Sequence, residues 1–236
     1  MPAPKAVLLD VGGIFHLPDH DRIRGAFERA EFTVDVDALD RAHYAGAATF
    51  TVERDAEIDW KTRWRGYLDA YITSCGVGDD PAVREEVHTH LDSEFAVGEL
   101  WSRIIPGSVD GLRELVATGV HVGIVSNADG TVGQRLAEQE VLQVGPGIGV
   151  EVDCVIDSGA VGVSKPDPRI FQLALDAIGV AATDAWYLGD MPGIDVVGAR
   201  AAGLWPIVMD PFGFQADADY HRVTALAEVA EMVSAS

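Results

Sequence analysis

The feature that most constrains the fold of this chain is a repeated alternation of short apolar runs with amphipathic stretches. The apolar, β-rich runs lie at residues 5–10, 120–125, 152–156, 185–188 and 204–209. The stretches with apolar positions three and four residues apart lie at 107–118, 130–142, 167–178, 192–202 and 222–233. The first pattern is typical of buried strands, and the second is typical of helices that pack on a sheet. Their alternation predicts crossover connections, and hence an α/β fold with a Rossmann-like, mostly parallel sheet.

One interval of the chain is too long for a single crossover. Residues 16–100 separate the first apolar run from the second and lack a strong strand pattern, whereas Trp64, Leu68 and Tyr71 fall on one face of a helix. We therefore expect a core domain formed by residues 1–15 and 101–236, with a small α-helical cap domain at 16–100 inserted after the first strand. The glycine-rich segment 145–149 is expected to be a connecting loop rather than a phosphate loop, because no helix clearly follows it.

Acidic residues stand at the ends of two of the apolar runs. Asp10 closes the first run, and Asp190 follows the fourth run, with Asp195 five residues later. In an open α/β sheet the carboxyl ends of the strands form the ligand-binding edge, so these carboxylates should converge there. Convergent carboxylates make a site for a hard cation that prefers oxygen ligands. The pattern therefore predicts a metal-dependent enzyme.

Composition narrows the class of partner. A formal net charge of -21 argues against sequence-independent binding to nucleic acid, since phosphate backbones attract basic surfaces. No apolar run is long enough to span a bilayer, and residues 1–5 carry no apolar targeting segment, so we expect a cytoplasmic protein with no membrane partner. Cys75 and Cys154 are isolated and predict neither a disulfide nor a thiolate metal site. The acidic bias fits a need for solubility as well as a saline habitat, and the oligomeric state has no signature in the sequence.

Four groups of residues at four strand ends define a resemblance to a known family. They are Asp10, then Ser126 with Asn127, then Lys165 before Pro166, and finally Gly189 and Asp190 with Asp195. In this order they resemble the motifs of the haloacid dehalogenase (HAD)-like hydrolase superfamily, in the subfamily with a helical cap inserted after the first motif. The resemblance covers essentially the whole chain.

The resemblance implies a hydrolase that uses Mg²⁺ and acts on a small phosphorylated metabolite. It makes Asp10 the nucleophile that forms an aspartyl-phosphate, with Ser126 and Lys165 as the other catalytic side chains. It places the metal against Asp10, Asp190, Asp195 and the backbone carbonyl of Gly12, and the phosphate against Gly12, Gly13, Ser126, Asn127 and Lys165. Mg²⁺ suits such a site because it takes few carboxylates and keeps places for water and for substrate phosphate.

Each of these residues also has a plainer interpretation. Asp10 could cap a turn, and Ser126 could cap a helix. Asp195 could stabilise the start of a helix through the macrodipole, and Lys165 could be a solvated surface residue. The four groups taken together favour the family interpretation over these separate ones.

One position departs from the family pattern. Members that hydrolyse phosphate esters usually carry a second aspartate two residues after the nucleophile, as general acid and then base, and here that position is Gly12. Such help is worth about 10² to 10⁴ in rate. Three explanations stay open: a leaving group that needs no proton, a substitute such as His16, Asp19, His20 or a cap side chain, or a protein that has lost catalysis and kept ligand binding.

A 2-haloacid dehalogenase is an alternative in which a missing acid is natural, because a halide leaves without a proton. The metal motif speaks against it, since dehalogenases of the superfamily do not use Mg²⁺, whereas Gly189, Asp190 and Asp195 follow the pattern of its phosphatases. The sequence therefore predicts a phosphatase, with a dehalogenase or a binding protein as alternatives. The cap would exclude water and select the substrate. Its candidate pocket residues are Trp60, Arg63, Trp64 and Arg65, with Trp64 expected to pack mainly inside the cap.

Overall fold

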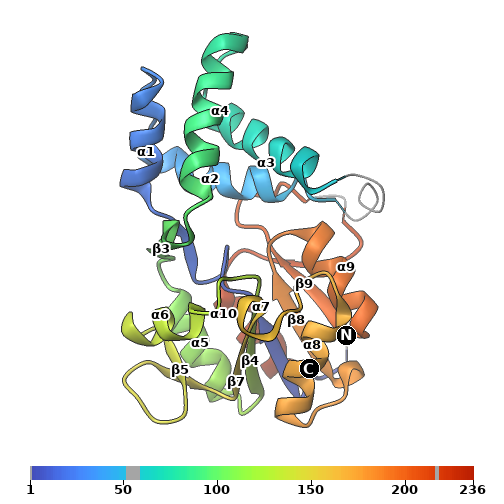
Figure 1. Ribbon diagram of the computed structural model, residues 1–236. Helices are drawn as coiled ribbons and strands as arrows, with labels where there is room; N and C mark the ends of the chain where they lie inside the picture. The colour runs from blue at the N-terminus through green and yellow to red at the C-terminus, as the bar shows by residue number, and fades with distance from the viewer. Residues whose placement is uncertain (1, 52–58, 216–217) are drawn as a thin grey trace.

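The computed structural model describes residues 2–51, 59–215 and 218–236. Its core is a six-stranded sheet in the order β10-β9-β8-β1-β4-β7, in which all neighbouring strands are parallel (Figure 1). The strands are β1 (Ala6–Leu9), β4 (His121–Ser126), β7 (Cys154–Asp157), β8 (Ala185–Gly189), β9 (Trp205–Met209) and β10 (His221–Val223). The chain adds β4 and β7 on one side of β1, then β8, β9 and β10 on the other, so the strand order reverses at β1. The predicted α/β fold with a parallel, Rossmann-like sheet is confirmed.

Helices cover both faces of this sheet. One face carries α5 (Ser108–Ala117), α6 (Val132–Glu138) and α10 (Leu226–Ser234), and the other carries α8 (Pro168–Ile178) and α9 (Pro192–Ala202). The short helices α7 (Ser158–Val161) and η2 (Ala182–Asp184) lie in the connections. In β1, Val7 and Leu9 belong to one apolar layer and Ala6 and Leu8 to the other, and all four are fully buried. Burial on both faces requires a continuous apolar run, which is why the sequence pattern located this strand.

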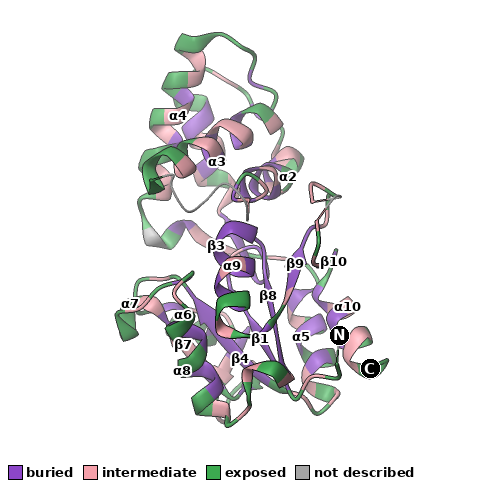
Figure 2. Ribbon diagram, turned by 90° about the vertical axis from the view of Figure 1, so that its right-hand side faces the viewer, coloured by how far each residue is buried: buried purple, intermediate pink, exposed green. Residues whose placement is uncertain are grey.

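In the described part of the chain, four α-helices lie between β2 (His16–Pro18) and β3 (Trp101–Ile104), as an insertion after β1. They are α1 (His20–Arg29), α2 (Val36–Ala47), α3 (Trp60–Ser74) and α4 (Pro81–Phe95). The insertion follows β2 and returns through η1 (Gly98–Leu100) to β3, which pairs antiparallel with β2. Figure 2 shows it standing above the sheet, with buried faces turned inward between its helices. The inserted helical domain is confirmed, and the boundaries at 1–15, 16–100 and 101–236 stay a prediction.

An apolar cluster of its own holds the insertion together. Phe27, Tyr67, Tyr71 and Leu91 are among its buried members, and Ile194 of α9 joins it from the core. The insertion therefore packs as a unit and also touches the core at the start of α9.

Aspartates start all four inserted helices. Asp19, Asp35, Asp59 and Asp80 each precede a helix, and each carboxylate accepts a hydrogen bond from a backbone N–H of the first turn. Such a cap stabilises a helix by about 1 kcal/mol. Part of the acidic excess of the chain therefore has a local structural role.

Short strands are the elements that the sequence pattern missed. β2, β3, β5 (Leu142–Val144), β6 (Val150–Val152) and β10 have three or four residues each, too few to show a period. The segment 145–149 connects β5 to β6 as a loop, as predicted. β10 pairs with β9, which delays the last helix from the predicted residue 222 to Leu226. Within the described residues, no helix is long and apolar enough to cross a membrane.

Candidate active site

The carboxyl ends of β1 and β8 bring three carboxylates together. The two strands are neighbours, and the backbone N–H of Asp10 donates to the carbonyl of Leu188 at 2.9 Å. Asp10, Asp190 and Asp195 are all buried, and one carboxylate oxygen from each lies within 4.8 Å of the others. The aspartates that the sequence placed at strand ends therefore share one small volume.

The turn between β8 and α9 fixes Asp195 next to Asp190. Asp195 lies in the first turn of α9, and its Oδ2 accepts from the backbone N–H groups of Asp190 at 3.0 Å and Met191 at 2.9 Å. Gly189 permits this geometry, because a Cβ at that position would collide with the Asp195 carboxylate. The second carboxylate oxygen of Asp195 is left to face the neighbouring charged groups.

Lys165 joins the carboxylates with all three of its ammonium N–H groups. Its Nζ donates to Asp10 Oδ2 at 2.5 Å, to Asp195 Oδ1 at 2.8 Å and to the Tyr187 hydroxyl at 2.7 Å. The backbone of Lys165 is held by Asn127, whose Oδ1 accepts from Lys165 N at 2.8 Å and whose Nδ2 donates to Lys165 O at 3.0 Å. The side chain of Asn127 therefore positions Lys165, and the surface interpretation of this lysine is excluded by its burial.

Burial dominates the ionisation of this cluster. It raises the pKa of Asp10 to about 7, because desolvation and the nearby Asp195 and Asp190 outweigh the attraction of Lys165. The pKa of Asp190 is also raised, again mainly by burial. Burial alone would lower the pKa of Lys165, but Asp10 and Asp195 reverse this and raise it above the ordinary lysine value. The lysine is thus cationic, while burial favours the protonated forms of Asp10 and Asp190.

Two adjacent glycines in the turn after β1 differ sharply in the space around them. Gly13 has a φ of 67°, and a Cβ there would lie 2.5 Å from Asp190 Cγ. A Cβ at Gly12 would lie 3.5 Å from the nearest ring atom of Trp101, which is ordinary contact. The close approach of Asp190 therefore requires glycine at position 13, whereas position 12 has room for a side chain.

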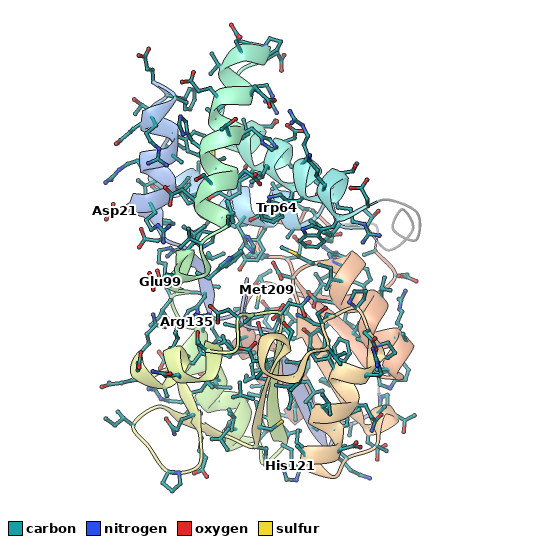
Figure 3. The ribbon with its side chains drawn as sticks, viewed as in Figure 1. Asp21, Trp64, Glu99, His121, Arg135 and Met209 are labelled. Carbon is teal, nitrogen blue, oxygen red and sulfur yellow. The ribbon has the colours of Figure 1, made fainter. Side chains whose placement is uncertain are left out.

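A cavity of about 630 Å³ opens above the carboxylates, between the core and the insertion. On the core side it is lined by Asp10, Gly12, Ser126, Asn127, Lys165, Asp190 and Asp195, and also by Asp129 and Arg135. On the other side the lining is aromatic and comes from Trp60, Trp64, Phe95 and Trp101. Figure 3 places Trp64 at the lower edge of the inserted helices and Arg135 at the top of the core. Of the residues predicted to bind the metal or the phosphate, Gly13 is absent from the lining in the described structure and lies against Asp190 instead.

The predicted pocket residues of the insertion divide into two groups. Trp60 and Trp64 line the cavity, and Trp64 also stacks on Tyr67 with ring centroids 4.8 Å apart. Trp64 therefore packs within the insertion and also forms part of the cavity wall. Arg65 instead pairs with Glu85 at 2.6 Å, and neither it nor Arg63 belongs to the cavity lining in the described part of the chain.

Of the three residues considered as a substitute acid, only His16 lines the cavity. Its Nε2 lies 2.6 Å from Gln139 Oε1, and burial lowers its pKa. Asp19 caps α1 and accepts from Arg22 N at 2.9 Å. His20 pairs with Asp40 at 2.7 Å, within the insertion. Of these three residues, His16 is therefore the one placed to exchange a proton with a ligand in the cavity, and a cap side chain stays open as an alternative.

Several residues at or behind the site were not predicted from the sequence, and Asp157 and His43 are two of them. Asp157 ends β7 and accepts from the backbone N–H groups of Gly130 at 2.9 Å and Val132 at 3.1 Å, so it shapes the loop after β4. The strand-end rule that found Asp10 could have found Asp157. His43 of α2, in the insertion, contacts Asp190, and His43 belongs to no recognisable sequence motif.

Comparison with known proteins identifies the family. A model of the haloacid dehalogenase-like hydrolase family matches residues 4–203. The chain belongs to this family of hydrolases, as its motifs predicted.

Relatives include two phosphatases that align with most of the chain. The phosphoserine phosphatase of Thermus thermophilus is 48% identical over 215 residues, which cover 89% of this chain and 83% of that protein. The ribulose-1,5-bisphosphate 5-phosphatase of Halopiger xanaduensis is 30% identical over 227 residues, which cover 89% of each chain. The crystal structure of a HAD-superfamily hydrolase from Ehrlichia chaffeensis matches with a TM-score of 0.61 at 16% identity, covering 100% of this chain and 98% of that one. This last likeness supports the fold alone.

Proposed function

We propose that this hydrolase is a Mg²⁺-dependent phosphatase that acts on a small phosphorylated metabolite through an aspartyl-phosphate on Asp10. The observation that carries the proposal is the buried cluster of Asp10, Asp190 and Asp195, in which the ammonium of Lys165 pairs with Asp10 and Asp195. The two phosphatases among the relatives support the same class of reaction.

The donor set of this cluster fits Mg²⁺. Three carboxylates within 4.8 Å of one another offer only oxygen ligands, which suit a hard cation, and burial raises the pKa of Asp10. Asp10, Asp190, Asp195 and the carbonyl of Gly12 would hold the ion. When bound, Mg²⁺ supplies positive charge that favours the ionised form of Asp10 and polarises the phosphoryl group.

The side chains of the cavity have distinct roles in this proposal. Asp10 attacks phosphorus with a carboxylate oxygen, and the ester P–O bond breaks as the leaving oxygen takes its electron pair. Ser126 and Lys165 hold the phosphoryl oxygens, and because all three N–H groups of Lys165 are engaged, the phosphate replaces one of these contacts. Water then attacks phosphorus, the bond between phosphorus and the Asp10 oxygen breaks, and inorganic phosphate leaves with the protons of the water while Asp10 is restored as a carboxylate.

Phosphate release from a metabolite panel tests this function. The panel holds phosphoserine and ribulose 1,5-bisphosphate because of the names of the two relatives, and it is assayed with Mg²⁺ and with EDTA. We expect Mg²⁺-dependent release that Asp10→Asn abolishes and that Asp176→Asn, at an exposed position on α8, leaves unchanged. Release that is equal in Asp10→Asn would exclude the proposed nucleophile.

Gly12 keeps dehalogenation as the second candidate function, because a halide needs no proton from the enzyme. Folded protein that releases no phosphate across the panel is therefore assayed for halide release from 2-haloacids in EDTA. Halide release under these conditions would replace the phosphatase proposal, and silence in both assays would favour a binding protein.

The missing carboxylate at Gly12 predicts a long-lived aspartyl-phosphate. Intact-protein mass after exposure to acetyl phosphate and Mg²⁺ should show one added phosphoryl group, absent in Asp10→Asn. Gly12→Asp should shorten the lifetime of this adduct by up to about 10²-fold. Gly12→Asn is the matched control, since the amide has a similar size and no basic carboxylate. Fast turnover with no adduct at any time point would point to another base, and His16→Gln would then be the variant to assay.

A further inference from the structure

A buried chain of hydrogen bonds runs from the insertion to a carboxylate of the proposed metal site. The Tyr67 hydroxyl on α3 lies 2.9 Å from His43 Nδ1 on α2, and His43 Nε2 lies 2.8 Å from Asp190 Oδ2. Tyr67 and His43 are 0% exposed. His43 is absent from the cavity lining, so within the described structure it approaches Asp190 from behind and not from the substrate side.

The direction of these hydrogen bonds follows from the groups involved. A carboxylate oxygen only accepts, so His43 Nε2 carries a proton and donates to Asp190 Oδ2. The pKa of Tyr67 is raised well above its ordinary value by burial, so its hydroxyl keeps the proton that it donates to Nδ1. The imidazole thus has one fixed orientation, and it engages one oxygen of Asp190 while Oδ1 makes no contact with it.

Packing within the insertion holds this chain in place. Gly46 lies one turn after His43, and a Cβ there would come within 2.6 Å of the Tyr67 ring. The absence of a side chain at Gly46 therefore lets α3 bring Tyr67 close to His43. Such a fit is sensitive to small changes, because packed interiors leave little room to adjust.

Helix α2 and the residues just after it also form hydrogen bonds with both turns that carry the carboxylates. The Tyr44 hydroxyl donates to the carbonyl of Gly13, in the turn after β1, at 2.7 Å. In the turn after β8, the backbone N–H of Gly193 donates to the carbonyl of Phe50 at 2.7 Å. Docking of α2 and the position of the carboxylates are therefore parts of one arrangement.

We propose that His43 is a positioning residue for the metal site, which orients the Asp190 carboxylate from the inserted helical domain and links metal affinity to the docking of α2. This inference rests on the proposed use of Mg²⁺ and does not depend on which substrate is hydrolysed. Partners that hydrogen-bond a metal ligand commonly orient it, and their loss weakens metal binding by about 10- to 100-fold. Linkage is reciprocal, so bound Mg²⁺ should stabilise the docked position of α2 by the same factor.

Calorimetric titration of the substrate-free protein with MgCl₂ tests the inference directly. His43→Leu removes the donor and should weaken Mg²⁺ binding by about 10- to 100-fold. His43→Gln keeps an N–H donor and should recover part of the loss. Tyr67→Phe removes one hydroxyl and should give a smaller loss in the same direction. Tyr71→Phe is the matched control, because Tyr71 is equally buried on the same helix and does not contact His43, and it should bind as the wild type does.

Hydrogen–deuterium exchange supplies a second measurement. Mg²⁺ should slow amide exchange in residues 36–47 of the wild type, and this protection should shrink in His43→Leu and in Tyr67→Phe. If His43→Leu fails to fold, Tyr67→Phe carries the test, since it leaves the packing volume nearly unchanged.

The outcomes separate this inference from the proposed function. Equal Mg²⁺ affinity in the wild type and in folded His43 and Tyr67 variants would overturn the role of His43 and leave the phosphatase standing. A wild-type protein that binds no Mg²⁺ would overturn the metal site and this inference together. Weakened Mg²⁺ binding in a protein that hydrolyses no phosphate ester would support His43 and reject the proposed reaction.

Discussion

On the core side of the cavity, charged groups come from the ends of adjacent strands; on the cap side, aromatic rings come from helices and from β3. Asp10 and Asp190 are fixed by the register of β1 and β8. The three N–H groups of Lys165 donate to Asp10, Asp195 and Tyr187. Trp60 and Trp64 are held by packing among the inserted helices, and Trp64 Nε1 also donates to Asp92 Oδ1 at 2.9 Å. The proposed chemistry therefore depends on backbone geometry and paired charge, whereas the proposed fit to a substrate depends on the shape of side chains.

The largest expected effect comes from breaking the charge balance of the core side. Lys165→Met leaves two buried carboxylates without their cation, so the free energy of unfolding in EDTA should fall by about 3–5 kcal/mol. Mg²⁺ should recover part of this loss by neutralising the carboxylates. Urea unfolding with and without Mg²⁺ gives both values.

Lys5→Met is the matched control for this substitution. Lys5 pairs with Asp184, but its side chain is 70% exposed, so the change should be about 1 kcal/mol or less. Equal losses for the two variants would mean that the buried cluster is no more sensitive than a surface pair.

The pH dependence of stability sharpens the same comparison. Burial raises the pKa of Asp10 from 3.8 to about 7, so between these pH values the folded chain holds a proton that the unfolded chain has released. The contribution of Asp10 to the free energy of unfolding is therefore present at low pH and is lost as pH rises from about 4 to about 7. Asp190 acts in the same direction, since its pKa is also raised.

Asp10→Asn isolates this contribution. In EDTA, the unfolding free energy of the wild type minus that of the variant should decrease with rising pH across this window. Excess Mg²⁺ should flatten the curve, because the ion favours the ionised carboxylates. A flat difference in EDTA would show that Asp10 ionises as an ordinary aspartate.

The turn after β1 lies between the core side and the cap side of the cavity. Substitution of its two glycines by alanine should change the unfolding free energy by different amounts. Gly13→Ala should lower the unfolding free energy by about 1–3 kcal/mol, because of the left-handed backbone and the collision with Asp190. Gly12→Ala should be close to neutral, since its Cβ reaches only ordinary contact with Trp101. Thermal unfolding of both variants checks the contrast, and similar melting temperatures would contradict it.

The smallest effect is expected on the cap side. Trp60 is 60% exposed, so Trp60→Ala should leave stability and kcat nearly unchanged. KM for the preferred substrate should rise by a factor that corresponds to about 0.5–1.5 kcal/mol of lost contact. Trp205→Ala is the control, because Trp205 is 42% exposed and lies at the start of β9, remote from the cavity lining. Equal KM values in the two variants would show that this cap wall does not contact the substrate.

The sequence was most informative where local pattern alone decides position. Asp10, Ser126 and Asp190 stand at the ends of strands, so their placement at one edge follows once the strands are recognised. Lys165 was harder to predict as a site residue, and it was recognised by its position between the Ser126 motif and the Asp190 motif. The fold and the family are confirmed, and the roles of these residues stay a prediction.

Other parts of the site depend on how separate elements dock, which local pattern does not encode. His43 reads as one polar residue within an amphipathic helix, and its contact with Asp190 exists only because α2 packs on the turn after β8. Likewise β2 is three residues long and forms because β3, more than eighty residues later, returns beside it. Such contacts join elements that are far apart in the sequence, so they can be recognised only when the arrangement of these elements in the folded chain is known.

The hydrogen bond from Tyr44 to Gly13 and the one between Gly193 and Phe50 also define where this chain could be cut and rejoined. A chimaera that took all four inserted helices from a relative would lose both hydrogen bonds. The turns after β1 and after β8 would then no longer be held by the insertion. A graft that replaced α1 and α4 alone would leave both hydrogen bonds intact, because neither helix takes part in these contacts. Such a graft would still have to match the apolar cluster that Phe27 of α1 and Leu91 of α4 share with α3.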